Sequence, residues 1–202
     1  MAESLLSDLI DRFCCLPGVG QKSAQRMAFH LLERDRKGGI LLADALSQAM
    51  TGIGDCQQCR TFSESEVCAL CIDPQRDKSQ LCIVEMPTDV FALRQATEYK
   101  GLFFVLKGHL SPIDGIGPNE LGLDRLEQRF QTGVVKELIL ATNATIEGLA
   151  TAHYVADLAE KYQVEVMRIA QGVPIGGELE FIDRNTLSHA FSSRVKYKNN
   201  TD

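Results

Sequence analysis

Two Cys-x-x-Cys pairs are the clearest chemical signal in the sequence. Cys56 and Cys59 form the first pair, and Cys68 and Cys71 form the second after eight intervening residues. Each pair can present two thiolates to one metal ion, and four thiolates in tetrahedral geometry suit zinc. Because four sulfur ligands leave no open coordination position, we predict one zinc ion with a structural role. The alternatives are four unconnected thiols or two redox-active pairs.

The other three cysteines, Cys14, Cys15 and Cys82, lie on an apolar helix end or in a predicted strand. We expect them to be buried small hydrophobic residues and not metal ligands. The total of seven cysteines is odd, and the N-terminus lacks the basic and apolar regions of a secretory signal. Both observations favour a reducing, cytoplasmic compartment. No apolar run reaches the roughly 18 residues of a membrane span, so none is expected.

A short glycine-containing turn, LPGVG (residues 16–20), separates two predicted helices. Backbone N–H groups around Gly18 and Gly20, at the start of a helix, form a natural cradle for a phosphate. Lys22 and Arg26 are four residues apart and therefore share one face of the second helix. This is the helix-hairpin-helix pattern, which contacts the DNA backbone without reading bases. The alternative is an ordinary helical hairpin with a solvated basic face.

The charge distribution supports DNA contact better than the total charge does. The formal net charge of the chain is -6, which by itself argues weakly against a nucleic-acid partner. Residues 20–37, however, hold five basic residues against Glu33 and Asp35, and so are net positive. Such a patch can bind phosphates with strong salt dependence. The predicted DNA-binding residues are Gly18, Gly20, Lys22, Arg26, Arg34, Arg36 and Lys37.

A third group of polar residues follows two predicted strands. Glu85 ends the first strand of the C-terminal half, and Asn143 and Glu147 follow the third. In an open parallel sheet the carboxyl ends of the strands converge on one crevice, so these side chains are expected to meet there. Acidic groups in such a place can hold magnesium for phosphoryl chemistry. The alternative is a polar crevice or a partner-binding edge.

The helices and strands predicted around these residues divide the chain into modules. Three helices are predicted at 4–14, 22–33 and 40–50, with Gly38-Gly39 ending the second. Residues 52–78 are polar and too poor in periodic apolar residues to form a core without a staple. The predicted modules are a helix-hairpin-helix region (1–53), a zinc module (54–78), an α/β domain (79–171) and a glycine-rich segment with a helix (172–202).

The α/β domain is predicted from continuous apolar strands that alternate with helices. The strands are expected at 81–85, 102–106, 138–141 and 164–169, and the helices at 88–97, 119–131 and 146–162. This alternation is typical of a mostly parallel sheet that is covered on both faces. The last residues, 196–202, are expected to be frayed.

With these motifs in this order, the chain resembles the bacterial RecR recombination mediators. The resemblance covers essentially the whole chain and rests on the segments LPGVGQKSAQRMAFHLL (16–32), CQQCRTFSESEVCALC (56–71), SPIDGIGP (111–118), ATNATIEGLATA (141–152) and GVPIGGELEFID (172–183). It implies an α+β multi-module fold: an N-terminal helix-hairpin-helix, a small four-cysteine zinc module and a C-terminal Toprim-like α/β domain.

The resemblance also implies a function and partners. Proteins of this family are expected to form ring-like homotetramers around DNA, here through residues 172–202 among others. They work with RecO, and in some bacteria RecF, at single-strand gaps, where they help RecA displace single-strand-binding protein. In the family, residues matching Lys22 and Arg26 contact DNA, and the Toprim face matching Glu147, together with Glu85 and Asn143, is expected to bind the RecO partner. A cytoplasmic location with nucleoid association during repair follows.

One departure from catalytic Toprim proteins argues against an enzyme. Topoisomerases and primases carry an Asp-x-Asp pair where this chain has Asn143 and Thr145. Glu85 and Glu147 alone would form a poor two-metal site, so we predict a DNA-binding protein with no catalytic residues. Two alternatives remain: a magnesium-dependent phosphoryl-transfer enzyme on DNA, and an adaptor that binds only proteins. Cleavage abolished by Glu85→Ala would indicate the first, and function retained without Lys22 and Arg26 the second.

Overall fold

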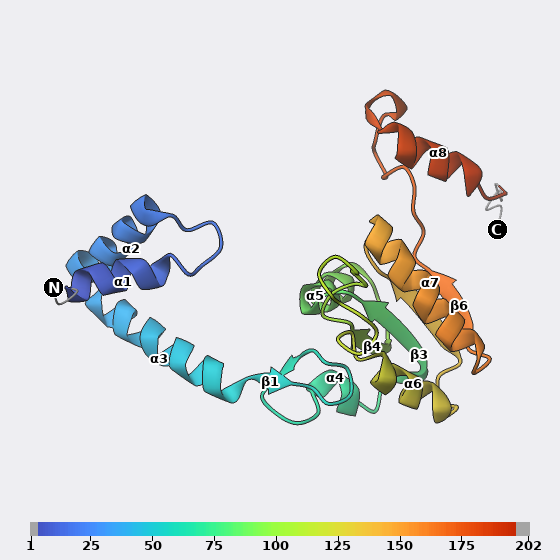
Figure 1. The fold of residues 1–202 in the computed structure, drawn as a ribbon, viewed down its shortest axis with the longest axis horizontal. Coiled ribbons are helices and arrows are strands. Elements are labelled where there is room, and N and C mark those ends of the chain that lie inside the picture. The colour runs from blue at the N-terminus through green and yellow to red at the C-terminus, as the bar shows by residue number, and fades with distance from the viewer. Residues whose placement is uncertain (1–3, 197–202) are drawn as a thin grey trace. The chain divides into compact units, whose positions relative to one another are not determined.

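The computed structural model describes residues 4–196 of the chain (Figure 1). They fall into two compact units, one ending at Gly54 and the other beginning at Asp55. The first unit is helical, and the second holds the four-cysteine cluster and the α/β domain. The fold class predicted from the sequence is therefore confirmed. Part of the segment predicted to fray, 197–202, lies outside the described residues, as do residues 1–3.

Three helices make up the first unit: α1 (Leu5–Phe13), α2 (Gln21–Arg34) and α3 (Arg36–Gly52). Ser4 caps α1 by accepting a hydrogen bond from the Ser7 N–H at 3.1 Å. Ala24 and Ala28 are the buried residues of α2, and both are fully inaccessible. Because alanine projects only a methyl group, the backbones of α1 and α2 can approach closely on this side. The hairpin turn at 16–20 is thereby held at the start of α2.

The predicted break after the second helix is wrong in its position. The sequence placed it at Gly38-Gly39, but α2 ends at Arg34 and α3 runs through both glycines. The boundary lies at Asp35 because its carboxylate accepts a hydrogen bond from the Gly38 N–H at 2.8 Å and caps α3. In the first turn of a helix such a cap offsets the cost of glycine. Arg36 and Lys37 therefore belong to the first turn of α3 and not to a loop.

The second unit begins with the cysteine-containing module. A two-stranded sheet pairs β1 (Gly54–Asp55) with β2 (Phe62–Ser63), and a one-turn helix, α4 (Ala69–Ile72), follows. The four cysteines form the buried centre of this module, with Val67 and Leu70 packed against them. So few apolar residues cannot hold a module together alone, in agreement with the predicted need for a staple.

The α/β domain is a four-stranded sheet in the order β4-β3-β5-β6, with all neighbouring strands parallel. Its strands are β3 (Asp77–Val84), β4 (Gly101–Val105), β5 (Glu137–Ala141) and β6 (Glu165–Arg168). The connecting helices are α5 (Pro87–Ala96), α6 (Leu123–Gln131) and α7 (Ile146–Glu160). Parallel strands require such crossover helices, which cover both faces. The elements expected from the sequence are all present, with shifted ends.

Alternation along the strands divides the core between the two faces of the sheet. On β3, Leu81 and Ile83 face a large cluster that includes Leu126 of α6 and Val155 of α7. Their neighbours Cys82 and Val84 face a smaller cluster with Val90 of α5. The sheet is therefore the middle of three layers, and every strand ends at the same edge, where the third group of polar residues lies.

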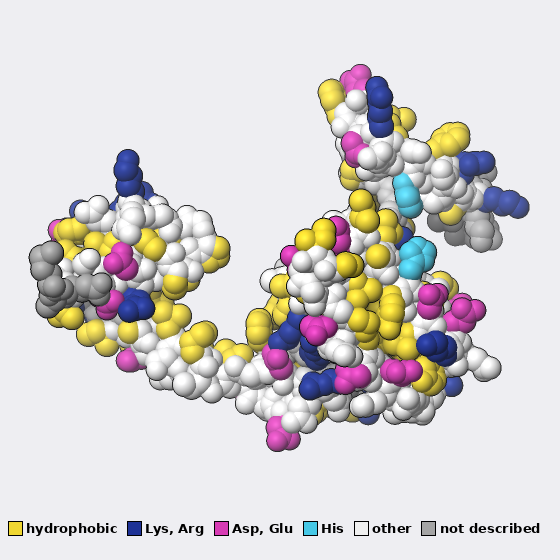
Figure 2. Space-filling view, viewed as in Figure 1, with side chains coloured by type: hydrophobic (Ala, Val, Ile, Leu, Met, Phe, Trp, Pro, Cys, Tyr) yellow, Lys and Arg dark blue, Asp and Glu magenta, His cyan; other side chains and the backbone are white. Residues whose placement is uncertain are grey.

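The C-terminal segment follows β6 as a short 3-10 helix, Leu179–Phe181, and helix α8 (Arg184–Ser192). Asp183 caps α8 by accepting from the N–H groups of Asn185 and Thr186, both at 3.0 Å. Large apolar side chains of this segment lie on the surface (Figure 2), namely Ile175, Leu179, Phe181, Phe191 and Val195. Among the helices in residues 4–196, none has the length and apolar character needed to cross a membrane.

Candidate metal centre and nucleic-acid interface

The sulfur atoms of the four paired cysteines converge on one point. All four Sγ atoms lie within 4.8 Å of one another, with Cys59 to Cys68 at 3.5 Å and Cys56 to Cys71 at 3.9 Å. A tetrahedral site with zinc–sulfur bonds of about 2.3 Å has sulfur–sulfur edges of about 3.8 Å. The cluster therefore fits one zinc ion, and it is the one group of potential metal ligands found within residues 4–196.

Local backbone geometry presents these thiolates and stabilises their charge. The N–H groups of Cys59 and Cys68 donate to the Cys56 sulfur at 3.5 and 3.3 Å. Burial alone would raise the pKa of Cys56, but these backbone hydrogen bonds outweigh it and lower the pKa to about 7. Burial raises the pKa of Cys68 to about 11. A metal ion is what makes four buried thiolates tolerable, so the predicted structural zinc is the chemistry that this donor set supports.

The turn between the first two cysteines is fixed to the α/β domain by backbone and side-chain contacts. The Val105 N–H donates to the Cys59 carbonyl at 2.9 Å. The Arg129 guanidinium lies 3.4 Å from both the Gln58 carbonyl and the Phe103 carbonyl of β4. Burial lowers the pKa of Arg129, and attraction to the neighbouring cysteine sulfurs opposes that shift. The zinc site and the sheet are thus one continuous structure.

Arg60 makes a second connection, which was not expected from the sequence. Its backbone has φ 63°, the left-handed region that L-residues seldom occupy. From this position the guanidinium donates to the carbonyls of Leu121 and, at 3.0 Å, Glu120, and it lies 5.9 Å from the centre of the Phe104 ring. In a sequence, an arginine beside a Cys-x-x-Cys pair is typical of a surface charge, so its role becomes visible only with the distant loop in place.

The remaining cysteines only partly match the expectation. Cys82 is buried in the sheet, 3% exposed, as predicted, and burial raises the pKa of its thiol to about 12. Cys14 is half-buried, and Cys15 is exposed, so the prediction of burial is wrong for Cys15. The reason is that α1 ends at Phe13, which places the next residues in a surface turn. None of the three belongs to the sulfur cluster.

The glycine turn leaves the start of α2 open. Gly18 has φ 78°, so the turn needs a residue without a Cβ there. A Cβ built on Gly18 or on Gly20 would meet no atom of the chain within 4 Å. Gly20 is the N-cap residue of α2 and has no side chain that could accept a hydrogen bond from the first turn. That first turn also contains no acidic residue. The free N–H groups at this terminus are therefore available to an external anion.

The seven predicted DNA-binding residues do not lie in one place. Lys22 and Arg26 are exposed on α2 close to the turn. Arg34 stands twelve residues after Lys22 on the same helix, which corresponds to a rise of about 18 Å. Arg36 and Lys37 follow it in the first turn of α3. Within residues 4–196 none of these five side chains forms an ion pair, so all remain electrostatically available.

At the carboxyl edge of the sheet, two of the three expected residues meet. The Asn143 backbone N–H donates to Glu85 Oε1 at 2.8 Å, and its side-chain amide donates to Oε2 at 2.7 Å. His109 Nδ1 lies 3.5 Å from the same Oε2, a contact that was not expected from the sequence. Glu85 is only 3% exposed, so its carboxylate is directed into this network and not towards solvent.

Glu147 belongs to the same edge but not to the network. It lies exposed in the first turn of α7, next to the largely exposed Ile146. Thr145 caps α7 by accepting from the Gly148 N–H at 3.0 Å. A Cβ at Gly148 would lie 2.2 Å from the Asn143 carbonyl oxygen, so only glycine lets α7 begin this close to the Glu85–Asn143 pair.

These features define a class of protein: a zinc-finger protein that joins a helix-hairpin-helix unit to a Toprim domain. Family models match four consecutive segments of the chain. They are described as the RecR helix-hairpin-helix (6–50), the RecR four-cysteine zinc finger domain (53–73), the Toprim domain (79–170) and the RecR C-terminal segment (172–195).

Curated relatives match at nearly full length. The Recombination protein RecR of Xylella fastidiosa is 59% identical over 196 residues, which cover 97% of this chain and 99% of the relative. That of Xanthomonas campestris pv. campestris is 61% identical over 191 residues, covering 95% and 97%. The chain belongs to the RecR family of recombination proteins.

Proposed function

We propose that this chain is a non-enzymatic mediator of DNA repair. It binds DNA at single-strand gaps and, with RecO and in some bacteria RecF, helps to load RecA onto single-stranded DNA covered by single-strand-binding protein. In this proposal it acts in the cytoplasm, at the nucleoid during repair, as a homotetrameric ring, with residues 172–202 contributing to assembly. The chain then works as four modules divided at residues 53, 78 and 171.

The observation that carries the proposal is the open N-terminus of α2. Gly18 and Gly20 leave space at uncapped backbone N–H groups, and Lys22 and Arg26 stand exposed beside them without an ion pair among the described residues. Backbone donors, a helix N-terminus and two cations together suit a phosphodiester backbone. Because this surface offers phosphate contacts alone, binding is independent of base sequence.

The edge with Glu85 supports a role in binding over a role in catalysis. Asn143 donates to both oxygens of the Glu85 carboxylate, so this acid is engaged in the hydrogen bonds of the protein itself. Glu147 and Ile146 are the exposed groups at the same edge. In the proposal they contact the RecO partner, while Glu85 and Asn143 hold the loop beneath that surface in place.

Fluorescence-anisotropy binding of gapped DNA across a salt series tests the proposal. Wild type is compared with Lys22→Ala/Arg26→Ala, with and without RecO, and Arg94→Ala/Arg168→Ala is the control that removes the same charge from exposed positions of the α/β domain. The proposal expects salt-dependent binding that the hairpin variant loses and the control retains. Equal binding by all three proteins would place the DNA site elsewhere. No binding in any condition would favour an adaptor that binds only proteins.

A further inference from the structure

We propose that the second unit has its own phosphate-binding site, a groove between the first zinc turn and α6 that receives the backbone of a nucleic-acid strand. The groove has a volume of about 580 Å³ and is lined by Gln57, Gln58, Arg125, Gln128, Arg129 and Thr132. This inference adds a contact to the proposed DNA-binding function and rests on it for the identity of the strand.

The lining consists of hydrogen-bond donors without a carboxylate. The lining residues carry two guanidinium groups and three side-chain amides, and none of the six residues is acidic. Among the described residues, Arg125 forms no ion pair, and no side-chain hydrogen bond is found for the three glutamines. In a chain of net charge -6, an acid-free set of side-chain donors that includes two guanidinium groups has the chemistry of an anion site.

Both walls of the groove are held in place. On one wall, Gln57 and Gln58 lie between the zinc ligands Cys56 and Cys59, so zinc fixes their backbone. On the other wall, the four residues of α6 and its C-terminal end follow at helical spacings of three and one, which puts them on one face. Arg129 joins the walls through its contact with the Gln58 carbonyl at 3.4 Å. Because the backbone of both walls is already fixed, binding has to order only the exposed side chains.

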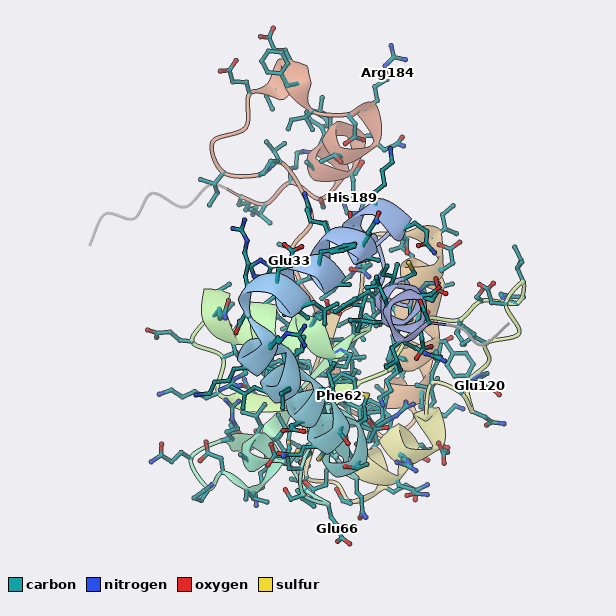
Figure 3. All side chains as sticks on the ribbon, turned by 90° about the vertical axis from the view of Figure 1, so that its left-hand side faces the viewer. Glu33, Phe62, Glu66, Glu120, Arg184 and His189 are labelled. Atoms are coloured by element: carbon teal, nitrogen blue, oxygen red, sulfur yellow. The ribbon has the colours of Figure 1, made fainter. Side chains whose placement is uncertain are left out.

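Nearby acidic groups do not fill the groove. Glu127 accepts a hydrogen bond from the hydroxyl of Tyr162, just beyond the end of α7, at 2.8 Å and is engaged there. Glu66, on the segment between the two cysteine pairs, extends outward from the molecule in Figure 3. The zinc-bound thiolates carry net negative charge, but the positive charge of Arg129, which lines the groove, interacts with them and offsets part of it. Asp124 precedes Arg125 on α6, but no ion pair between the two is found within residues 4–196, so Arg125 is an exposed cation of this wall.

The shape and the lining favour a strand backbone over a base or a small free anion. No aromatic side chain lines the groove, so it provides no surface on which a base could stack. Gln57, Gln58, Arg125 and Gln128 are all exposed, so both walls of the groove are accessible from solvent. Phosphodiester oxygens match the fork of a guanidinium and the amide donors around it.

The test uses the full-length, zinc-loaded protein and compares Arg125→Glu with Arg94→Glu. Arg94 is exposed on α5 and, like Arg125, has no ion pair within residues 4–196, so the two variants change the net charge equally. Binding of single-stranded and gapped DNA is measured across a salt series. Arg125→Glu is expected to weaken binding about tenfold, as for a lost charged hydrogen bond, and to flatten the salt slope by about one. Equal affinity and slope for the two variants would overturn the inference.

Two further measurements test whether the variant is folded and whether the groove binds a strand or a small anion. Zinc content and the thermal midpoint show whether Arg125→Glu is intact; if it is not, Gln57→Glu on the opposite wall replaces it, with the same expected loss and the same disproof. Inorganic phosphate is titrated while backbone amide resonances of residues 57 and 58 are followed. Saturable shifts with phosphate, but no effect of Arg125→Glu on DNA, would assign the groove to a small free anion and overturn the strand assignment.

The hairpin variant separates this inference from the proposed function. If Lys22→Ala/Arg26→Ala loses DNA binding and Arg125→Glu has no specific effect, the hairpin site is supported and the groove is refuted as a DNA-binding site. The reverse result, with an effect of Arg125→Glu alone, would place the main DNA contact in the second unit. If both sites contact the same strand, a variant that combines Lys22→Ala, Arg26→Ala and Arg125→Glu should lose binding free energy roughly equal to the sum of the separate losses.

Discussion

Asn143 holds both oxygens of the Glu85 carboxylate, with its backbone N–H at 2.8 Å from Oε1 and its side-chain amide at 2.7 Å from Oε2. The pair closes the carboxyl edge of the sheet between β3 and β5. A buried carboxylate is costly unless its lone pairs are satisfied, and Asn143 satisfies them as a neutral donor. Asn143 stands where catalytic Toprim proteins carry an aspartate, and here it donates hydrogen bonds to the carboxylate of Glu85.

Replacing Asn143 with aspartate should destabilise the second unit. Asn143→Asp removes the amide donor and places a second carboxylate against the buried Glu85, so about 1–3 kcal/mol of the free energy of unfolding should be lost. Like charges raise the pKa of a carboxyl group, so the loss should be largest at neutral pH and should shrink as the pH falls and one group is protonated. Chemical unfolding at several pH values measures it. Thr145→Asp is the control, because aspartate also caps α7 at that position; equal effects of the two changes would refute the explanation.

Removing one thiolate should release the zinc and loosen the cysteine module. Cys59→Ser leaves three sulfur ligands, and because metal binding is coupled to folding here, both zinc content and thermal midpoint should fall. Elemental analysis and calorimetry report the two quantities. Cys15→Ser, at an exposed cysteine outside the cluster, should change neither. Stoichiometric zinc retained by Cys59→Ser would contradict the four-sulfur site.

Zinc retention should depend on pH in a defined direction. Burial raises the pKa of the Cys68 thiol to about 11 in the absence of metal, so protons compete with zinc for this sulfur at every pH below that value. As the pH falls, the competition grows and zinc is held less tightly. Transfer of zinc to a colorimetric chelator should therefore be faster at pH 6 than at pH 8. A rate that is independent of pH, or faster at pH 8, would speak against proton competition at the thiolates.

Two substitutions of Arg60 can separate the contributions of its side chain and of its backbone conformation to the free energy of unfolding. Arg60→Ala removes the donors to the Glu120 and Leu121 carbonyls and should lower the free energy of unfolding by about 1–3 kcal/mol. Arg60→Gly loses the same contacts but suits the φ of 63°, so it should be about 1 kcal/mol more stable than the alanine variant. Denaturant unfolding compares the pair. An alanine variant as stable as wild type would show that the link to the loop contributes nothing.

Lys22 should contribute a phosphate contact that is blind to sequence. Lys22→Ala is expected to weaken binding to unrelated DNA sequences by a similar factor and to reduce the salt slope by about one. Competition between duplexes of different base composition, repeated at several salt concentrations, provides the measurement. An effect confined to one sequence would mean that the hairpin reads base edges.

The order of the modules, the four-cysteine zinc site and the parallel sheet could be predicted from the amino-acid sequence. These follow from local signals: Cys-x-x-Cys spacing, a glycine turn between amphipathic helices, and apolar runs that alternate with helices. Local patterns were misleading where a side chain a few residues away decides the outcome. Asp35 caps α3, so the chain bends there and Gly38-Gly39 is helical; the end of α1 exposes Cys15.

Most contacts between residues that are distant in the sequence become visible only in the folded protein. Arg60 reaches Leu121 across about sixty residues of sequence, and Arg129 joins the zinc turn to β4. The meeting of Glu85 with Asn143 was expected from the sequence, but the two hydrogen bonds between them were not. Such pairs leave no periodic trace, because one polar residue in a loop or on a helix face looks the same whether it meets solvent or a buried carbonyl. The parallel order of the strands brings the ends of β3 and β5 together, and that physical closeness turns two separate motifs into one network.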